Sequence, residues 1–151
     1  LRLRVIGKPR ENGDTARLIE ALGIASQVDF ESGISTAALV RRYAEATLVV
    51  VPSLYEGFGL PAGEAMACGA PVVSSDGGAL PEVVGDAGVL VPAGDDAALE
   101  QAIRALLADP SRRAELGRRA RARVLEQFCW GRAAREMTRY YEQVLAAHGN
   151  G

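Results

Sequence analysis

Two glutamates stand on either side of a glycine-rich turn in the stretch VPSLYEGFGLPAGEAMACGAPVV. Glu56 precedes this turn and Glu64 follows it, eight positions later. Gly57 and Gly59 let a ligand approach the backbone without meeting Cβ atoms. If a helix begins at Pro61, its first N–H groups and the positive end of its dipole form an anion site, for which phosphate is the usual ligand.

The two carboxylates would repel a phosphate placed between them, so each is expected to accept hydrogen bonds from neutral hydroxyls beside it. Glu64 lies one turn inside the predicted helix and suits the hydroxyls of a ribose, whereas Glu56 faces the other end of the same ligand. A nucleotide-sugar has this order of groups. The pair alone does not require such a ligand, because Glu64 could simply favour the helix N-terminus and Glu56 could be a solvated loop residue.

Strands alternate with helices along most of the chain. Apolar runs predict strands at residues 1–6, 27–30, 47–52, 71–75 and 87–92. Helical spacing predicts helices at 13–23, 36–46, 61–68, 94–109, 111–128 and 131–147, and one helical turn at 81–85. Asp14, Ser35 and Asp109 are expected to cap three of these helices.

This alternation predicts an α/β fold with a Rossmann-like parallel sheet, right-handed crossovers, helices on both faces and a helical C-terminal third. Such sheets bind ligands beyond the carboxyl ends of their strands, where the two glutamates lie. The loop DGGALPE follows the next strand, and it is either a plain turn or part of the same pocket.

The composition indicates one ordinary globular domain of 151 residues, with 48% hydrophobic and 24% charged residues. The net charge of −2 gives no sign of nucleic-acid binding. Two cysteines far apart in the sequence predict no metal site and no disulfide framework. The chain lacks a signal peptide and an apolar run long enough to span a bilayer, so we expect a cytoplasmic protein.

The string PSLYEGFGLPAGEAMACGAPVVSSDGGALPE resembles the C-terminal, donor-binding half of retaining glycosyltransferases of the GT-B fold, family 4, also called glycosyl transferases group 1. The spacing from Glu56 to Glu64, with seven residues between them, is that family's hallmark. The resemblance continues through AGVLVPAGDDAALEQAIRALLADP and FCWGRAAREMTRYYEQVL, and so covers nearly the whole chain.

The resemblance implies a catalytic position for Glu56, against the donor sugar and the reaction centre. It assigns donor binding to Gly33, Ile34, Phe58, Gly59, Leu60 and Glu64. The amides of the 58–60 stretch would meet the sugar and the diphosphate, and Glu64 would bind the ribose hydroxyls. The loop at Gly33 would lie beside the nucleobase. Whether Glu56 is a nucleophile or only a stabiliser of an oxocarbenium-like species is left open.

The activity implied by the resemblance is transfer of a sugar, of hexosyltransferase type, from a UDP- or GDP-linked donor with retention of anomeric configuration. Neither a bound metal nor a cofactor is expected. The implied acceptor is a glycan, a lipid or a small molecule in bacterial polysaccharide or glycolipid biosynthesis. Two alternatives stay open: a nucleotide-sugar-binding module without catalysis, and an epimerase or starch-synthase-like member of the same fold.

The chain departs from the family pattern at its start, because its first strand resembles the family's second strand. Residues 1–151 are therefore expected to be a nucleotide-sugar-binding C-terminal domain without the family's first strand, its basic loop or the N-terminal acceptor domain. We expect this piece alone to be inactive. An unfilled central strand position would favour self-association. Gly63 also departs, since the family usually has a larger apolar residue there.

Several arginines make the predicted 111–128 helix strongly basic: Arg112, Arg113, Arg118, Arg119, Arg121 and Arg123. A solvated face is the first interpretation of this helix. Peripheral contact with anionic lipids at the inner face of the membrane is the second. Phe128 and Trp130 are expected to anchor the helix that follows.

Overall fold

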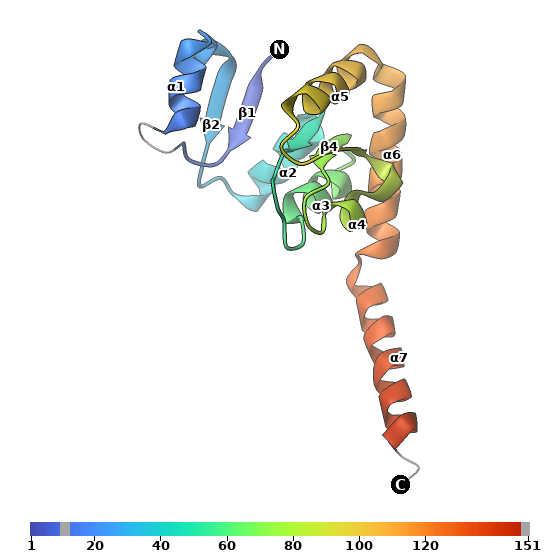
Figure 1. Cartoon of the computed structure of the whole chain (residues 1–151). Coiled ribbons are helices and arrows are strands. Elements are labelled where there is room, and N and C mark those ends of the chain that lie inside the picture. Colours follow the sequence, from blue (N-terminus) through green and yellow to red (C-terminus); the bar gives the residue numbers. More distant parts are fainter. Residues whose placement is uncertain (10–12, 149–151) are drawn as a thin grey trace. The chain divides into compact units, whose positions relative to one another are not determined.

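The computed structural model describes residues 1–9 and 13–148, and the chain divides into two compact units, Leu1–Leu39 and Val40–Gly151. The first unit contains β1 (Leu3–Ile6), α1 (Asp14–Ala21), a 3₁₀ turn (Ala25–Gln27) and β2 (Val28–Glu31) (Figure 1). The boundary falls inside α2 (Thr36–Glu45). The second unit contains β3 (Val49–Val51), α3 (Leu60–Ala67), β4 (Val72–Ser75), α4 (Leu80–Val84), a 3₁₀ turn (Gly85–Ala87), β5 (Val89–Val91), α5 (Asp96–Ala108), α6 (Pro110–Gln127) and α7 (Trp130–His148).

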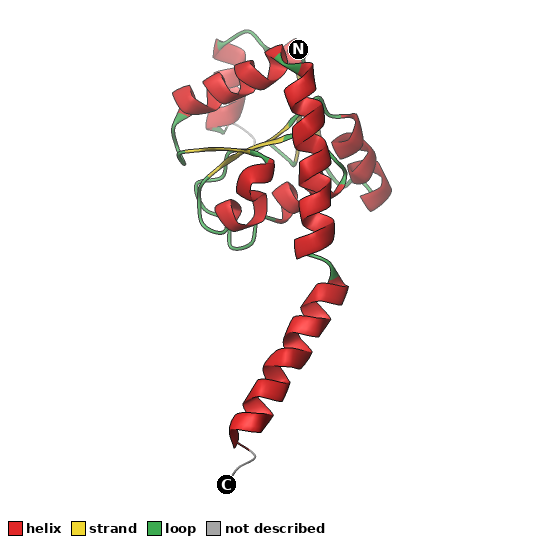
Figure 2. Cartoon of the chain, turned by 90° about the vertical axis from the view of Figure 1, so that its right-hand side faces the viewer, coloured by secondary structure: helices red, strands yellow, loops and turns green. Residues whose placement is uncertain are grey.

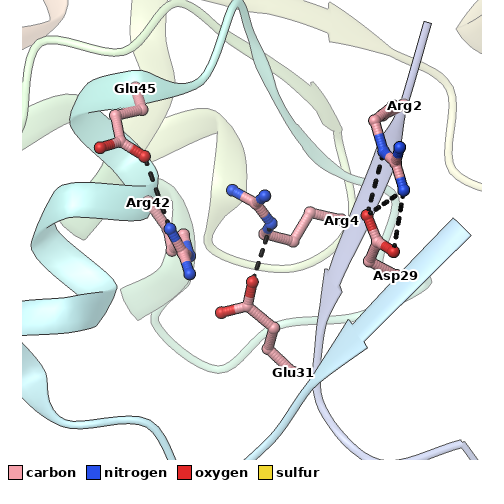
Figure 3. A network of polar contacts seen from close by, with 6 residues as sticks. All are labelled: Arg2, Arg4, Asp29, Glu31, Arg42 and Glu45. Carbon is pink, nitrogen blue, oxygen red and sulfur yellow. Dashed lines mark hydrogen bonds and ion pairs between the residues drawn. The ribbon is translucent and has the colours of Figure 1, made fainter.

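The first unit is built on a parallel pair of strands, β1 and β2, in which Leu3 lies opposite Val28. Two ion pairs connect these strands (Figure 3): Arg2 with Asp29 at 3.2 Å, and Arg4 with Glu31 at 2.9 Å. Exposed pairs of this kind each contribute about 0–1 kcal/mol. A further pair in the same figure, Arg42–Glu45, lies within α2 and belongs to the second unit.

The second unit is built on three parallel strands in the order β3-β4-β5, with β4 buried throughout its length. Successive side chains of a strand point to opposite faces of the sheet. Val72 therefore joins one core cluster, with Met66 of α3 and Leu80 of α4, whereas Val73 joins the other, with Leu106 of α5. Helices thus cover both faces, as the sequence predicts.

The number, positions and parallel direction of the five predicted strands are confirmed. The α/β fold with parallel strands is confirmed, and its strands form two hydrogen-bonded sheets, β1-β2 and β3-β4-β5. The alternation of strands and helices determines that neighbouring strands run parallel, but it does not determine which strands share a sheet.

The helix starts follow the predicted caps with one exception. Ser35 accepts a hydrogen bond from the amide of Ala38 at 3.2 Å, and Asp109 accepts one from the amide of Arg112 at 2.9 Å. Asp14 was expected to cap α1, and this is wrong: Gly13 occupies the N-cap position without any side-chain cap. Asp14 is the first residue of the helix, where its charge still favours the positive end of the dipole.

The C-terminal third is helical, as Figure 2 shows. The expectation that Phe128 and Trp130 anchor α7 is wrong for Trp130, whose side chain is 91% exposed. Phe128 instead packs edge-on against Phe58, with ring centroids 6.1 Å apart. No residue of α7 is buried. Within the described residues, no helix combines the length and apolar character needed to cross a bilayer.

Candidate functional site

The site is built where β3 gives way to α3. Gly59 is the N-cap of α3 and has left-handed backbone angles, φ +86° and ψ +41°. A Cβ atom at this position would lie 2.8 Å from Cδ2 of Leu80, a fully buried residue of α4. Glycine is therefore required here both for its backbone conformation and for the close approach of α4. Pro61 then favours the first helical turn, as predicted.

The first turn of α3 leaves backbone amides free to bind a ligand. The first hydrogen bond of the helix runs from the amide of Gly63 to the carbonyl oxygen of Gly59, at 3.1 Å. Among residues 1–9 and 13–148, no acceptor is bonded to the amides of Gly59, Leu60 or Ala62. These N–H groups, at the positive end of the helix dipole, can donate hydrogen bonds to the oxygens of an anion.

The carboxylate and the backbone of Glu56 are both held in place. The hydroxyl of Ser53 donates to Oε1 of Glu56 at 2.8 Å. The hydroxyl of Ser75, at the end of β4, donates to the carbonyl oxygen of Ser53. The amide of Ala79 donates to the carbonyl oxygen of Glu56 at 2.9 Å. Glu56 is partly buried, so its charge sits in a fixed position at the carboxyl ends of the strands.

The DGGALPE loop supports the Glu56 loop from the side. Glu56 and Gly78 form an isolated parallel bridge. A Cβ atom at Gly77 would lie 2.5 Å from the carbonyl oxygen of Leu54, and one at Gly78 would lie 3.0 Å from the amide nitrogen of Glu56. The two glycines are therefore needed because two backbones run in contact. The DGGALPE loop thus supports the backbone of the Glu56 loop, and its place in the donor pocket stays a prediction.

Glu64 lies on α3 with its side chain exposed, and its carboxylate has one partner from another helix. The hydroxyl of Tyr43, on α2, donates to Oε2 of Glu64 at 3.3 Å. Burial, with the nearby charge of Glu64, raises the pKa of Tyr43 to about 12. Nothing in the local sequence around Glu64 indicated this partner.

The seven predicted site residues are divided between the two units. Gly33 and Ile34 lie in the first unit, in the loop between β2 and α2, and Gly33 is left-handed with φ +65°. The others lie in the second unit: Glu56, Phe58, Gly59, Leu60 and Glu64. That Gly33 and Ile34 adjoin the ligand of the second unit stays a prediction.

The model of the glycosyl transferases group 1 family matches residues 1–123. The chain belongs to this family. MMP α-(1→4)-mannosyltransferase of Mycolicibacterium hassiacum is 42% identical over 147 residues, which are 95% of this chain and 36% of that protein. The group 1 chain thus spans about a third of the length of the curated relatives that it matches.

Solved structures support the same family. Sucrose-phosphate synthase from Thermosynechococcus elongatus is 39% identical to this chain, with a TM-score of 0.82. The match covers 97% of this chain and 39% of the synthase chain. TarM of S. aureus, crystallised as a mutant with fondaparinux, α-GlcNAc-glycerol and UDP, is 26% identical to this chain, with a TM-score of 0.76. The match covers 85% of this chain and 26% of the TarM chain. The parallel α/β architecture is that of the C-terminal half of a GT-B fold.

A feature that the sequence did not predict is that arginines of α6 hold the C-terminal ends of the site helices. Arg121 donates to the carbonyl oxygen of Ala67, the last residue of α3, at 2.6 Å. Arg123 donates to the carbonyl oxygens of Glu82 and Val83 in α4, at 2.7 and 2.9 Å. Charged donors at these ends satisfy carbonyl groups that the helices leave unbonded. In this group 1 chain, α6 therefore supports both helices whose N-terminal ends adjoin Glu56.

Two glycines allow α6 to approach α3 this closely. A Cβ atom on Gly117 of α6 would overlap the carbonyl oxygen of Gly69, which ends α3 with a φ of +77°. Arg113 likewise donates to the carbonyl oxygen of Leu107 in α5 at 2.8 Å, and Arg119 pairs with Asp86 at 2.5 Å. Arg119 and Arg121 are exposed, as a solvated face requires, whereas Arg113 and Arg123 are partly buried, so the interpretation as a solvated face is wrong for these two. Lipid contact stays a prediction.

The described residues of the group 1 chain contain no group of three or more His, Cys, Asp and Glu side chains that could hold a metal ion. A small cavity of about 100 Å³ lies at the carboxyl ends of β3 and β5, between Leu54 and Leu99. It is too small for a nucleotide. The candidate site is the open surface at the N-terminal end of α3, where the free amides and the two glutamates lie.

Proposed function

We propose that this chain is the donor-binding part of a retaining hexosyltransferase that takes its sugar from a UDP- or GDP-linked donor. The observation that carries the proposal is the set of unbonded amides at the N-terminus of α3, with a carboxylate before them at Glu56 and another behind them at Glu64. Membership of the group 1 family supports a glycosyltransferase activity. The UDP in the TarM structure supports a nucleotide donor.

In this proposal each part of the donor meets one part of the site. The diphosphate accepts hydrogen bonds from the amides of Gly59 and Leu60, at the positive end of the α3 dipole. The ribose hydroxyls donate to Glu64, one turn into the helix. The sugar lies on the side of Glu56. The loop at Gly33 and Ile34 contacts the base.

The proposed chemistry follows from the charges. When the bond between the sugar and the diphosphate breaks, negative charge develops on the leaving diphosphate, and the free amides of α3 stabilise it without any need to reorganise. Positive charge develops on the sugar, and the carboxylate of Glu56 lies on that side. The hydrogen bond from Ser53 fixes the direction of this carboxylate. The site uses neither a metal nor a cofactor in this scheme.

The acceptor differs among the relatives of this chain. The MMP α-(1→4)-mannosyltransferase and a D-inositol 3-phosphate glycosyltransferase of Gordonia bronchialis, 39% identical over 152 residues, have names that indicate different acceptors, and the chain matches about a third of each. We propose an acceptor with a free hydroxyl, in a glycan, a lipid or a small molecule. We also propose a cytoplasmic location, where nucleotide-sugars are made.

The proposal is tested by calorimetric titration of the chain with UDP and GDP, beside the variants Glu64→Gln and Glu142→Gln. Glu142 lies on α7, is exposed and serves as the matched control. Loss of a hydrogen bond to a charged group corresponds to about 1.5–3 kcal/mol, so we expect Glu64→Gln to raise the Kd at least about tenfold.

Binding of one nucleotide, weakened in Glu64→Gln and unchanged in Glu142→Gln, is the expected result, and it identifies the base of the donor. Failure of both nucleotides to bind the unsubstituted chain contradicts the proposal for this chain. Equal affinity in Glu64→Gln and the unsubstituted chain contradicts the placing of the ribose at Glu64.

A further inference from the structure

Tyr43 connects the predicted ribose-binding carboxylate to the core of the second unit. Its ring is partly buried and packs against the cluster that contains Met66 and Val72. Its hydroxyl donates to Oε2 of Glu64 at 3.3 Å, although the two residues are 21 positions apart. A rigid ring on α2 thus reaches a flexible carboxylate on α3.

The hydroxyl of Tyr43 is a donor at every pH at which the protein would work. Burial and the negative charge of Glu64 raise the pKa of Tyr43 to about 12, so the proton stays on the phenol. A carboxylate accepts hydrogen bonds at both oxygens and has about four lone-pair positions. With Oε2 held by Tyr43, Oε1 and the remaining lone pair of Oε2 are available to a ligand.

We infer that Tyr43 is a positioning residue that orients the carboxylate of Glu64 toward the 2′- and 3′-hydroxyls of a ribose. The pair then distinguishes ribonucleotides from deoxyribonucleotides. This inference rests on the proposed function, and it adds a residue that the local sequence around the site does not indicate.

The physical reason is preorganisation. A glutamate on a helix surface has several rotamers, and a ligand that binds to one of them must immobilise the side chain. Ordering one such side chain corresponds to about a two- to tenfold change in affinity. A tyrosine that already holds the carboxylate in one orientation lowers the entropic cost of immobilising the glutamate. Only ligands that bind to the carboxylate gain affinity from this effect.

The experiment compares Tyr43→Phe with the unsubstituted chain. Phenylalanine keeps the ring in the core and removes only the hydroxyl. The Kd is measured for the nucleoside diphosphate (UDP or GDP) and for its 2′,3′-dideoxy counterpart, which lacks both hydroxyls. Tyr140→Phe, at an exposed tyrosine of α7, is the control. Urea unfolding of each variant measures its stability separately.

We expect Tyr43→Phe to weaken binding of the ribonucleotide about two- to tenfold and to leave the dideoxy nucleotide unchanged. Tyr140→Phe should change neither Kd. In the double variant Tyr43→Phe/Glu64→Gln, the loss should equal that of Glu64→Gln alone, since the tyrosine acts through the glutamate.

Equal weakening of both nucleotides by Tyr43→Phe overturns the inference, because it indicates a general structural effect. No change for either nucleotide also overturns it. In both cases the proposed function stands if Glu64→Gln still weakens the ribonucleotide. If the unsubstituted chain binds neither nucleotide, the proposed function fails and this inference fails with it.

Discussion

Substitution of Gly59 by alanine tests how α3 begins, because the structure gives two separate reasons for glycine at this position. The φ of +86° is unfavourable for any residue with a Cβ atom, at a cost of about 1–2 kcal/mol. The new Cβ would also lie 2.8 Å from Cδ2 of Leu80. Leu80 has no exposed surface and therefore no room to turn aside, so overpacking adds about 1–3 kcal/mol.

Two other glycines separate these contributions. Gly94 has a similar φ of +81°, but a Cβ there would make only an ordinary contact, 3.5 Å from Cδ2 of Leu54. Gly57 does not have a left-handed φ, and a Cβ there would meet nothing within 4 Å. Gly57→Ala should therefore change stability little, Gly94→Ala should cost about 1–2 kcal/mol, and Gly59→Ala should cost about 2–5 kcal/mol.

The assay is equilibrium urea unfolding, followed by circular dichroism. With a slope of about 1–3 kcal/mol per molar urea, the loss of about 2–5 kcal/mol expected for Gly59→Ala lowers the midpoint by roughly 0.7–5 M. Equal midpoints for Gly59→Ala and Gly94→Ala would show that Leu80 does not resist the new methyl group. A Gly59→Ala midpoint as high as that of Gly57→Ala would refute the left-handed N-cap itself.

Three further predictions concern the supports of the site. Gly117→Ala should destabilise the protein by about 1–3 kcal/mol in urea unfolding, because its methyl group would overlap a carbonyl oxygen; stabilisation, the usual effect of alanine in a helix, would contradict the close packing. Arg123→Met should cost about 1–3 kcal/mol, since it leaves the part-buried carbonyl group of Val83 in α4 without its donor, whereas Arg112→Met, at an exposed position, should cost little. The raised pKa of Tyr43 means that the unfolded chain loses this proton first, so stability should fall as the pH rises from about 10 to about 12. In Glu64→Gln the pKa of Tyr43 in the folded protein should be lower, so the fall in stability should still begin near about pH 10 but should end at a lower pH. Part of the pKa shift should remain, because burial is its larger cause. An unchanged pKa of Tyr43 in a spectrophotometric titration would count against the contact.

The segment that holds Glu56 illustrates how far local sequence reaches. The apolar run before it predicted a strand, the glycines predicted a loop, and Pro61 predicted the start of a helix, and the structure confirms each of these. Such signals depend on backbone torsion angles and on the spacing of apolar side chains over a few residues. The same signals gave the caps at Ser35 and Asp109.

The local signals failed where two starts were nearly equivalent. Gly13 and Asp14 can each be the N-cap of α1. Aspartate is the more common N-cap residue, but here Gly13 is the N-cap and Asp14 is the first residue of the helix. They also gave no information about which strands pair. Each of the two sheets is parallel, as predicted, yet the assignment of strands to sheets depends on packing that the chain makes only after folding.

The sequence by itself determined the order of the elements, the family and the positions of the two glutamates. Only the tertiary structure decided what holds those glutamates and their helix in place. Tyr43 and Glu64 are 21 positions apart, and Arg121 is 54 positions from the carbonyl group that it binds. Contacts over such separations follow from the way in which helices and strands pack against one another, and no pattern of neighbouring residues encodes them.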